Sequence, residues 1–330
     1  MYPMYFLSYI CQLILRALTQ LKPTEKWGKS YLKKLEQQYH GAFEKHLFEK
    51  VAKYQSIQLH LVANTFSALF GRTNNKMEEE NNILYFLMTA LYDELIDAHK
   101  MEEATLNELF YHPENARPVN FNERVLVAIH LELLNRVPDK AAYWQVIENI
   151  HQAQKDSALQ FDEAISKEKI IDITLRKGGY SLLMCRHYLK DPIYKQIDDC
   201  WYSIGGLIQM TNDLFDTYKD TQEGIHTFAN STNNMESIID TYNNQIQILR
   251  DNIHQLPVSQ KRKKQFAISL AIIPAFGFIA INQLSKIQDA GNVLPDFKSI
   301  PRKALIIDME KPLNIFRLIL HAYKIGKSWM

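Results

Sequence analysis

Apolar residues recur along this chain at intervals of three and four positions. The pattern is clear in "FEKHLFEKVAKYQSIQLHLVANTFSALF" (residues 43–70) and in "IIDTYNNQIQILRDNIHQL" (residues 238–256). This spacing puts the apolar side chains on one face of an α-helix. Strand-like alternation is scarce and no segment resembles a linker. The sequence therefore predicts an all-α fold, with one helical-bundle domain over residues 1–330.

Two apolar segments need separate interpretation. Residues 1–20, "MYPMYFLSYICQLILRALTQ", carry Ser8, Gln12 and Arg16 at four-residue steps, which predicts an amphipathic, mostly apolar helix. We expect it to dock on the core, and contact with a membrane surface is the alternative. It lacks the basic start and cleavage site of a signal peptide.

The second segment, "FAISLAIIPAFGFIAI" (residues 266–281), follows the basic run "KRKK" and contains Pro274. A membrane-spanning helix needs about 20 apolar residues. The segment is shorter, so it predicts a buried helix, lining an apolar pocket or at the centre of a bundle.

Composition narrows the function classes. The net charge is +1, so nothing indicates a nucleic-acid partner held by bulk electrostatics. The cysteines, Cys11, Cys185 and Cys200, show no spacing typical of disulfides or metal sites. This usage suits a reducing compartment and predicts a cytoplasmic protein.

An acidic cluster lies in "QMTNDLFDTYKD" (residues 209–220). Asn212, Asp216 and Asp220 follow one another at four-residue steps, so a helix would align them in one oxygen-rich column. Like charges at this spacing destabilise a bare helix. The column is therefore either a well-solvated face or a place where a cation binds.

A second cluster ends the apolar run "ILYFLMTALYDELIDAHK" (residues 83–100), where Asp93 and Asp97 are four residues apart and Glu94 lies beside them. Either cluster alone is common on helices. Together they predict two helices that face each other across a cavity. Carboxylate and amide oxygens are ligands that Mg²⁺ prefers, and Mg²⁺ completes its shell with water and phosphate oxygens. A phosphorylated substrate is the expected guest.

These motifs carry a family resemblance. "DELID" resembles the DDxxD motif of class I terpene synthases, with Glu94 in the place of the second Asp. "NDLFDTYKD" resembles their second metal motif, NDxxSxxxE. Asn212, Asp216 and Asp220 take its metal-ligand positions, and Lys219 takes that of a lysine common before the last acid. The resemblance implies a helical bundle with a central active-site cavity, about three Mg²⁺ ions, tolerance of Mn²⁺, and a linear isoprenyl diphosphate substrate.

Cationic residues that would hold the diphosphate follow from position. Arg176 and Lys177 precede Gly178 and Gly179, a pair that predicts a helix break, as in the terpene synthases. In the family an Arg–Tyr pair closes over the diphosphate, and Arg317 and Tyr323 are its counterparts here, although they are six residues apart. His226, in "GIHTFAN", is expected to be a loop residue.

Three functions stay open. A terpene synthase, which ionises one allylic diphosphate and then cyclises or eliminates, is favoured because the second-substrate arginine and lysine motifs of elongating synthases are missing. The beginning of the acidic cluster at residues 209–220, "QMTNDLFD", is also similar to the second aspartate-rich motif of trans-isoprenyl diphosphate synthases. Prenyl transfer, including head-to-head condensation, is therefore the alternative. A non-catalytic helical binding or scaffold protein is the third. The sequence is compatible with a homodimer.

Overall fold

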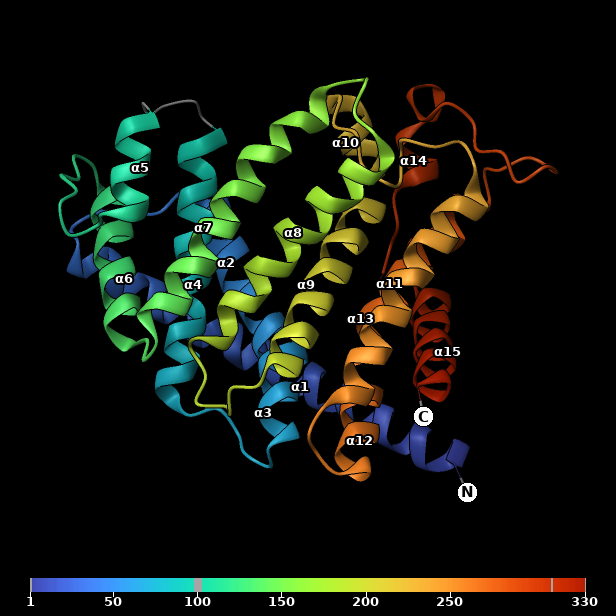
Figure 1. Cartoon of the computed structure of the whole chain (residues 1–330), viewed down its shortest axis with the longest axis horizontal. Coiled ribbons are helices and arrows are strands. Elements are labelled where there is room, and N and C mark those ends of the chain that lie inside the picture. The colour runs from blue at the N-terminus through green and yellow to red at the C-terminus, as the bar shows by residue number, and fades with distance from the viewer. Residues whose placement is uncertain (1, 98–102, 310, 330) are drawn as a thin grey trace. The chain divides into compact units, whose positions relative to one another are not determined.

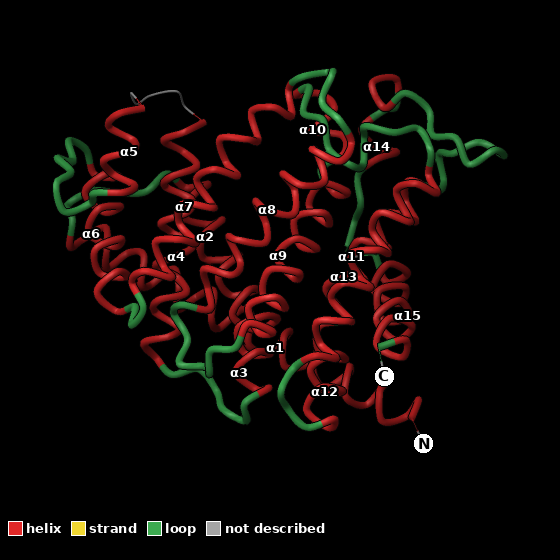
Figure 2. Tube along the Cα trace, in the orientation of Figure 1, coloured by secondary structure: helices red, strands yellow, loops and turns green. Residues whose placement is uncertain are grey.

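The computed structural model describes residues 2–97, 103–309 and 311–329, and it omits the side chains of residues 1–18 and 96–106. Over the described residues the chain is helical and forms no β-strand (Figures 1 and 2). The prediction of an all-α fold is confirmed. The α-helices are α1 (Tyr2–Gln38), α2 (Lys45–Gln58), α3 (Asn64–Leu69), α4 (Lys76–Asp97), α5 (Glu103–Tyr111), α6 (Phe121–Arg136), α7 (Lys140–Asp156), α8 (Lys167–Arg186), α9 (Lys195–Phe215), α10 (Thr217–Glu223), α11 (Met235–Gln255), α12 (Gln260–Leu270), α13 (Ile272–Leu284), α14 (Arg302–Leu305) and α15 (Pro312–Ser328). A π-helix, η1 (Leu59–Ala63), and two 3₁₀ segments, η2 (Ser157–Phe161) and η3 (Phe297–Ser299), connect them.

The chain divides into two compact units. The amino-terminal unit comprises Cys11–Tyr143 and His187–Asp191. The carboxyl-terminal unit comprises Met1–Ile10, Trp144–Arg186 and Pro192–Met330. The expectation of one domain over residues 1–330 stays a prediction, because two compact units can belong to one domain or to two.

The amino-terminal unit is built around α4, which packs against α2 and α6. Leu84, Leu87 and Leu91 of α4 are fully buried. The start of α4 is fixed by Arg72, whose guanidinium pairs with Glu78 at 2.8 Å and with Asp191 at 2.6 Å. The acidic cluster of Asp93, Glu94 and Asp97 thus lies at the end of a core helix.

In the carboxyl-terminal unit α9 is central and packs against α8, α11 and α13. Trp201, Ile204 and Leu207 of α9 are fully buried. α8 and α9 approach closely where Gly178 faces Gly205, since a Cβ added to either glycine would collide with the backbone carbonyl of the other. Small residues at this crossing let the two backbones come together.

This crossing corrects one prediction. Gly178 and Gly179 do not break a helix: α8 runs without interruption from Lys167 to Arg186. The close approach that the two glycines permit is that of a neighbouring helix. Gly179 in turn leaves room for the ring of Tyr202.

The apolar segment 266–281 is helical and buried, as predicted, although it is divided between α12 and α13 at Ala271. Pro274 lies in the first turn of α13, where its missing N–H leaves no helical hydrogen bond unmade. The stretch Gln260–Leu284 is long and apolar enough to cross a membrane, by length and composition alone. Within its most apolar window 72% is buried, as in a core helix.

The predicted N-terminal helix is present but longer than residues 1–20, since α1 continues to Gln38 through Pro23. The polar residues Ser8, Gln12 and Arg16 have side chains outside the described set. Docking on the core and contact with a membrane surface both stay predictions for this segment.

The α8–α9 crossing can be tested with two neighbouring glycines. Gly205→Ala should lower the free energy of unfolding by roughly 1–3 kcal/mol, because the new methyl group meets the Gly178 carbonyl. Gly206→Ala is the matched control: its methyl group meets only the end of the Leu175 side chain, at 2.8 Å. We expect it to be neutral or stabilising, since alanine favours helix. Chemical denaturation measures both, and equal stabilities would contradict this account of the crossing.

Candidate functional site

The acidic cluster of Asn212, Asp216 and Asp220 lies where α9 ends and α10 begins. Asp216 interrupts the helix, with φ −93° and ψ 8°. The prediction that one continuous helix carries residues 209–220 is therefore wrong. The spacing nevertheless survives. The backbone N–H of Asp216 donates to the carbonyl of Asn212 at 2.8 Å, and that of Asp220 donates to Asp216 at 2.9 Å. These helical hydrogen bonds keep Asn212, Asp216 and Asp220 in the predicted register.

The acids differ in burial. Asn212 and Asp216 are exposed, whereas Asp220 and the neighbouring Asp213 are buried. Asp213 accepts hydrogen bonds from Thr174 of α8 at 3.1 Å and from Gln209 at 3.0 Å. Two bonds hold its carboxylate against the helix crossing. Asn212 and Asp216 are therefore better placed than Asp213 to bind a ligand from solvent, and Asp220 lies buried behind them.

Asp213 was not among the site residues predicted from the sequence. One signal could have indicated its position: Gly205, Gln209 and Asp213 follow at four-residue steps, on the face of α9 that meets α8. This spacing identifies the face of α9 that contacts α8 only when the position of α8 is already known.

Burial leaves this cluster electrostatically unbalanced. It raises the pKa of Asp213 to about 6, although hydrogen bonds from Gln209 and Thr174 and the charge of Lys177 lower it. Burial, with the negative charges of Asp213 and Asp216, raises the pKa of Asp220 to about 7. Partial desolvation also raises the pKa of Asp216. Binding a proton or a metal cation stabilises such a group of acids.

The nearby cations Arg176 and Lys177 differ in their interactions. Arg176 is held by two carboxylates, since its Nη2 lies 2.6 Å from Asp156 Oδ2 and 2.8 Å from Asp172 Oδ2. The hydrogen bond from Arg176 lowers the pKa of Asp156 to about 2. Lys177, the next residue, is the one whose charge acts on Asp213. Without a helix break, no local distortion turns Arg176 toward the acids.

Lys219 is exposed and lies 3.9 Å from Glu223, one helical turn further on. Its charge lowers the pKa of both Asp216 and Asp220, which burial raises more strongly. Lys219 therefore adjoins the acidic column, and its role in substrate binding stays a prediction.

Arg317 and Tyr323 lie on α15, which packs against α12 and α13. Both are half-buried. Arg317 lies near His321 and, after burial and the charge of Lys324, contributes to lowering the pKa of that histidine. Among the described residues, Arg317 is not one of the charges that shift Asp213, Asp216 or Asp220. Closure over a diphosphate by Arg317 and Tyr323 stays a prediction.

The loop after α10 contains His226, as expected for a loop residue. The His226 N–H donates to the Gln160 carbonyl at 2.7 Å, and the His226 carbonyl accepts from Gln160 Nε2 at 3.0 Å. The loop borders a cavity of about 760 Å³ in the carboxyl-terminal unit. These two bonds fix the backbone of His226 against η2.

Asp93 and Glu94, of the acidic cluster that ends α4, line an open cavity of about 700 Å³ in the amino-terminal unit. Asp93 is exposed and Glu94 half-buried. The side chain of the third acid, Asp97, lies outside the described set, although its backbone ends α4. The cavity is lined by Ala42, Glu44, His46, Leu47, Lys50, Ala90, Asp93, Glu94, Leu95, Asn120, Phe121 and Asn122.

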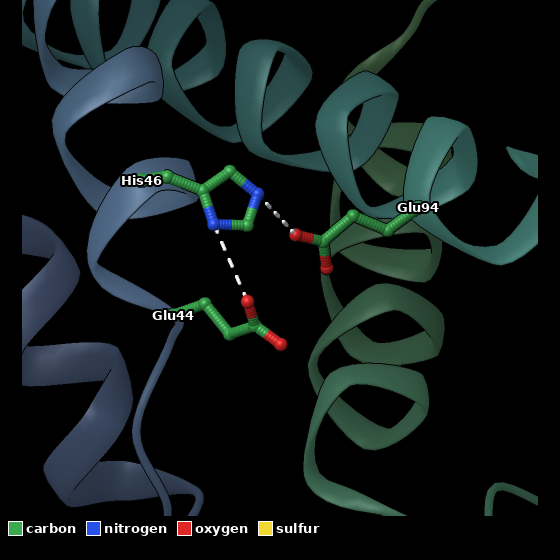
Figure 3. Close-up of side chains that lie close together, drawn as sticks. All are labelled: Glu44, His46 and Glu94. Atoms are coloured by element: carbon green, nitrogen blue, oxygen red, sulfur yellow. Dashed lines mark ion pairs between the residues drawn. The ribbon is translucent and has the colours of Figure 1, made fainter. Parts of the chain in front are cut away.

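Glu94 contacts residues that the sequence did not connect with it. Its Oε1 lies 3.2 Å from His46 Nε2, and its Oε2 accepts from Asn122 at 3.4 Å. On the other side of the ring, His46 Nδ1 lies 3.3 Å from Glu44 (Figure 3). One ring nitrogen of His46 and one carboxylate oxygen from each of Glu44 and Glu94 lie within 4.8 Å of one another, so the three residues form a group that could hold a metal ion. Exposed acidic groups of this kind are also common without a metal.

The two acidic clusters belong to different units, Asp93 to the amino-terminal and Asn212 to the carboxyl-terminal one. A cavity shared by their helices stays a prediction. In comparisons with known proteins, no protein-family model and no curated protein matches the chain.

The electrostatic imbalance predicts a pH dependence. The ordinary pKa of Asp is 3.8, and that of Asp220 in the folded protein is about 7. Between these values the folded protein keeps a proton that the unfolded chain loses, so the free energy of unfolding falls as pH rises. Asp220→Asn should remove this loss. At about pH 8 in metal-free buffer, we expect the variant to be roughly 1–4 kcal/mol more stable than wild type, because one pKa unit corresponds to about 1.4 kcal/mol.

The difference should vanish below about pH 4, where both side chains are neutral. Asp240→Asn, at an exposed position of α11, is the control and should leave the pH profile unchanged. Denaturation across this pH range measures the effect. An Asp220→Asn variant no more stable than wild type at about pH 8 would show that the carboxylate is already neutralised.

Proposed function

We propose that this protein is a Mg²⁺-dependent enzyme of the class I terpene synthase type, which ionises a linear allylic isoprenyl diphosphate and releases diphosphate. One observation supports it above all. Asn212, Asp216 and Asp220 keep their metal-motif spacing across the α9–α10 junction, and the acids there have raised pKa values. A hard divalent cation binds to oxygen atoms, and here three oxygen-bearing side chains lie at regular spacing without enough positive charge nearby to balance the acids.

The donor set fits Mg²⁺. Asn212 offers an amide oxygen and Asp216 a carboxylate, both exposed, and Asp220 offers a second carboxylate behind them. In the proposal, Asp93, Glu94 and Asp97 hold the remaining ions, of about three in all, from the first motif. Bound Mg²⁺ would stabilise the negative charge of the departing diphosphate.

Asp213 acts indirectly in this scheme. Its bonds to Thr174 and Gln209 fix the last turn of α9, and its charge lies behind the ligands. It therefore positions Asn212 and Asp216. Of the two cations expected to hold the diphosphate, the proposal keeps Lys177 and not Arg176, because the charge of Lys177 acts on this cluster while Asp156 and Asp172 bind Arg176.

Turnover provides the direct test. The full chain is incubated with Mg²⁺ and one linear allylic diphosphate at a time, over chain lengths from about ten to about thirty-five carbons. Diphosphate release is measured without a co-substrate. Asp216→Asn should lower turnover at least about a hundredfold, because it weakens a group that stabilises leaving-group charge. Chelation should abolish activity and Mg²⁺ should restore it, with Mn²⁺ tolerated.

Asp240→Asn serves again as the control and should keep full activity. Release that requires a second, homoallylic diphosphate would instead identify a prenyltransferase. The scaffold alternative predicts no release with any substrate. Full activity after exhaustive chelation would contradict the metal-dependent mechanism.

The two adjacent cations can be separated. Lys177→Ala should lower turnover about tenfold or more, while the free energy of unfolding changes little. Arg176→Lys should cost up to about 1 kcal/mol of stability through its partly exposed ion pairs and should leave turnover nearly intact. Turnover and chemical denaturation are measured on both variants. The reverse order of activities would mean that Arg176 leaves Asp156 to bind the substrate.

A further inference from the structure

The outer face of α15 is apolar in its first half. Leu313, Phe316 and Leu320 recur at i, i+3 and i+7, so they share one face of the helix. They are 57%, 63% and 40% exposed. The opposite face is buried: Leu318, Ala322 and Ile325 lie on the side that packs against α13 and α12. An exposed stripe of large apolar side chains is a typical mark of an interaction surface.

Basic residues continue this face in the second half of α15. Lys324 and Lys327 follow Leu320 at i+4 and i+7, and both are exposed. Arg317 flanks the stripe. The helix, Pro312–Ser328, contains no acidic residue.

The first turn of α12 adds further cations at the end of α15. Lys263 Nζ donates to the His254 carbonyl at 2.5 Å, and His254 Nε2 lies 3.0 Å from the Trp329 carbonyl, just after α15. His254 thus joins the two helix ends. Lys261 and Arg262, which are exposed, lie in the same turn as Lys263. In Figure 1, α12 lies beyond the carboxyl end of α15.

We propose that this face, an apolar stripe on α15 followed by Lys324, Lys327, Lys261 and Arg262, binds the surface of a membrane that contains anionic lipids. An interfacial helix buries its apolar side chains at the acyl boundary, while lysine and arginine attract lipid phosphates. The proposal concerns a surface distinct from the acidic cluster and does not rest on the proposed activity.

Charge favours a membrane over a second copy of the chain packed in parallel. Two parallel copies of α15 that met through the stripe would bring Arg317, Lys324 and Lys327 close to the same residues of the other copy. No acid on the helix could pair with them, and like charges at such distances destabilise packing. An anionic surface supplies the missing negative charge.

Flotation of the full chain with lipid vesicles tests the proposal. We expect binding to vesicles of phosphatidylcholine mixed with phosphatidylglycerol, weakening as salt is added, and little binding to phosphatidylcholine alone. Leu313→Gln/Phe316→Gln should lower the vesicle partition coefficient on the order of tenfold or more, because less apolar area is buried. Lys324→Gln/Lys327→Gln should lower it by a similar factor on the anionic vesicles only.

Two matched controls separate this face from general surface effects. Ile248→Gln changes an exposed apolar residue of α11, and Lys195→Gln/Lys298→Gln changes two exposed lysines elsewhere in the same unit. Both should bind as wild type. The proposal fails if wild type does not float with anionic vesicles, or if the α15 variants bind no worse than the controls. It also fails if sedimentation shows a dimer that Phe316→Gln dissociates while vesicle binding is unchanged.

Discussion

The contact between Gly178 of α8 and Gly205 of α9 is the constraint on which the carboxyl-terminal unit depends. It lets two helix backbones approach without intervening side chains, and it fixes the rotation of each helix about its axis. One consequence follows directly: Thr174, one turn before Gly178, reaches Asp213, two turns after Gly205. Once Asp213 points into the crossing, Asn212 and Asp216 must point elsewhere, toward solvent. The orientation of the acidic column is thus set by two glycines that carry no functional group.

The same packing creates an electrostatic cost. Thr174 and Gln209 satisfy Asp213 with hydrogen bonds, yet burial still raises its pKa to about 6, and Asp220, close behind, has a pKa of about 7. Groups that destabilise a fold at neutral pH are expected mainly where a function needs them. The buried side chains of α9, such as Trp201, stabilise the helix enough to hold these acids in place. A cation that binds there would relieve the repulsion and stabilise the protein by mass action.

Local patterns in the sequence predicted what local physics decides. The three-and-four spacing predicted the helices, the apolar run 266–281 predicted a buried segment, and the four-residue steps predicted the register of Asn212, Asp216 and Asp220. Predictions that depend on distant residues were less successful. Gly178 and Gly179 indicate a helix break or a close helix contact equally well until the partner, Gly205, is known. Arg176 pairs with Asp156, which lies 20 residues earlier in the chain, and Glu94 pairs with His46 of another helix. The local sequence pattern indicates neither pair.

The distribution of charge also constrains how an anionic substrate could bind under the proposed function. Near the acidic column the described cations are Lys177 and Lys219, and Lys219 also interacts with Glu223. Arg176 is neutralised by Asp156 and Asp172. A diphosphate that approached Asp216 and Asp220 in their ionised form would meet more negative than positive charge, and repulsion between like charges at a few ångströms is strong where water is excluded. Metal ions would therefore have to bind before the diphosphate or together with it. On this argument the metal is needed for substrate binding as well as for the chemical step.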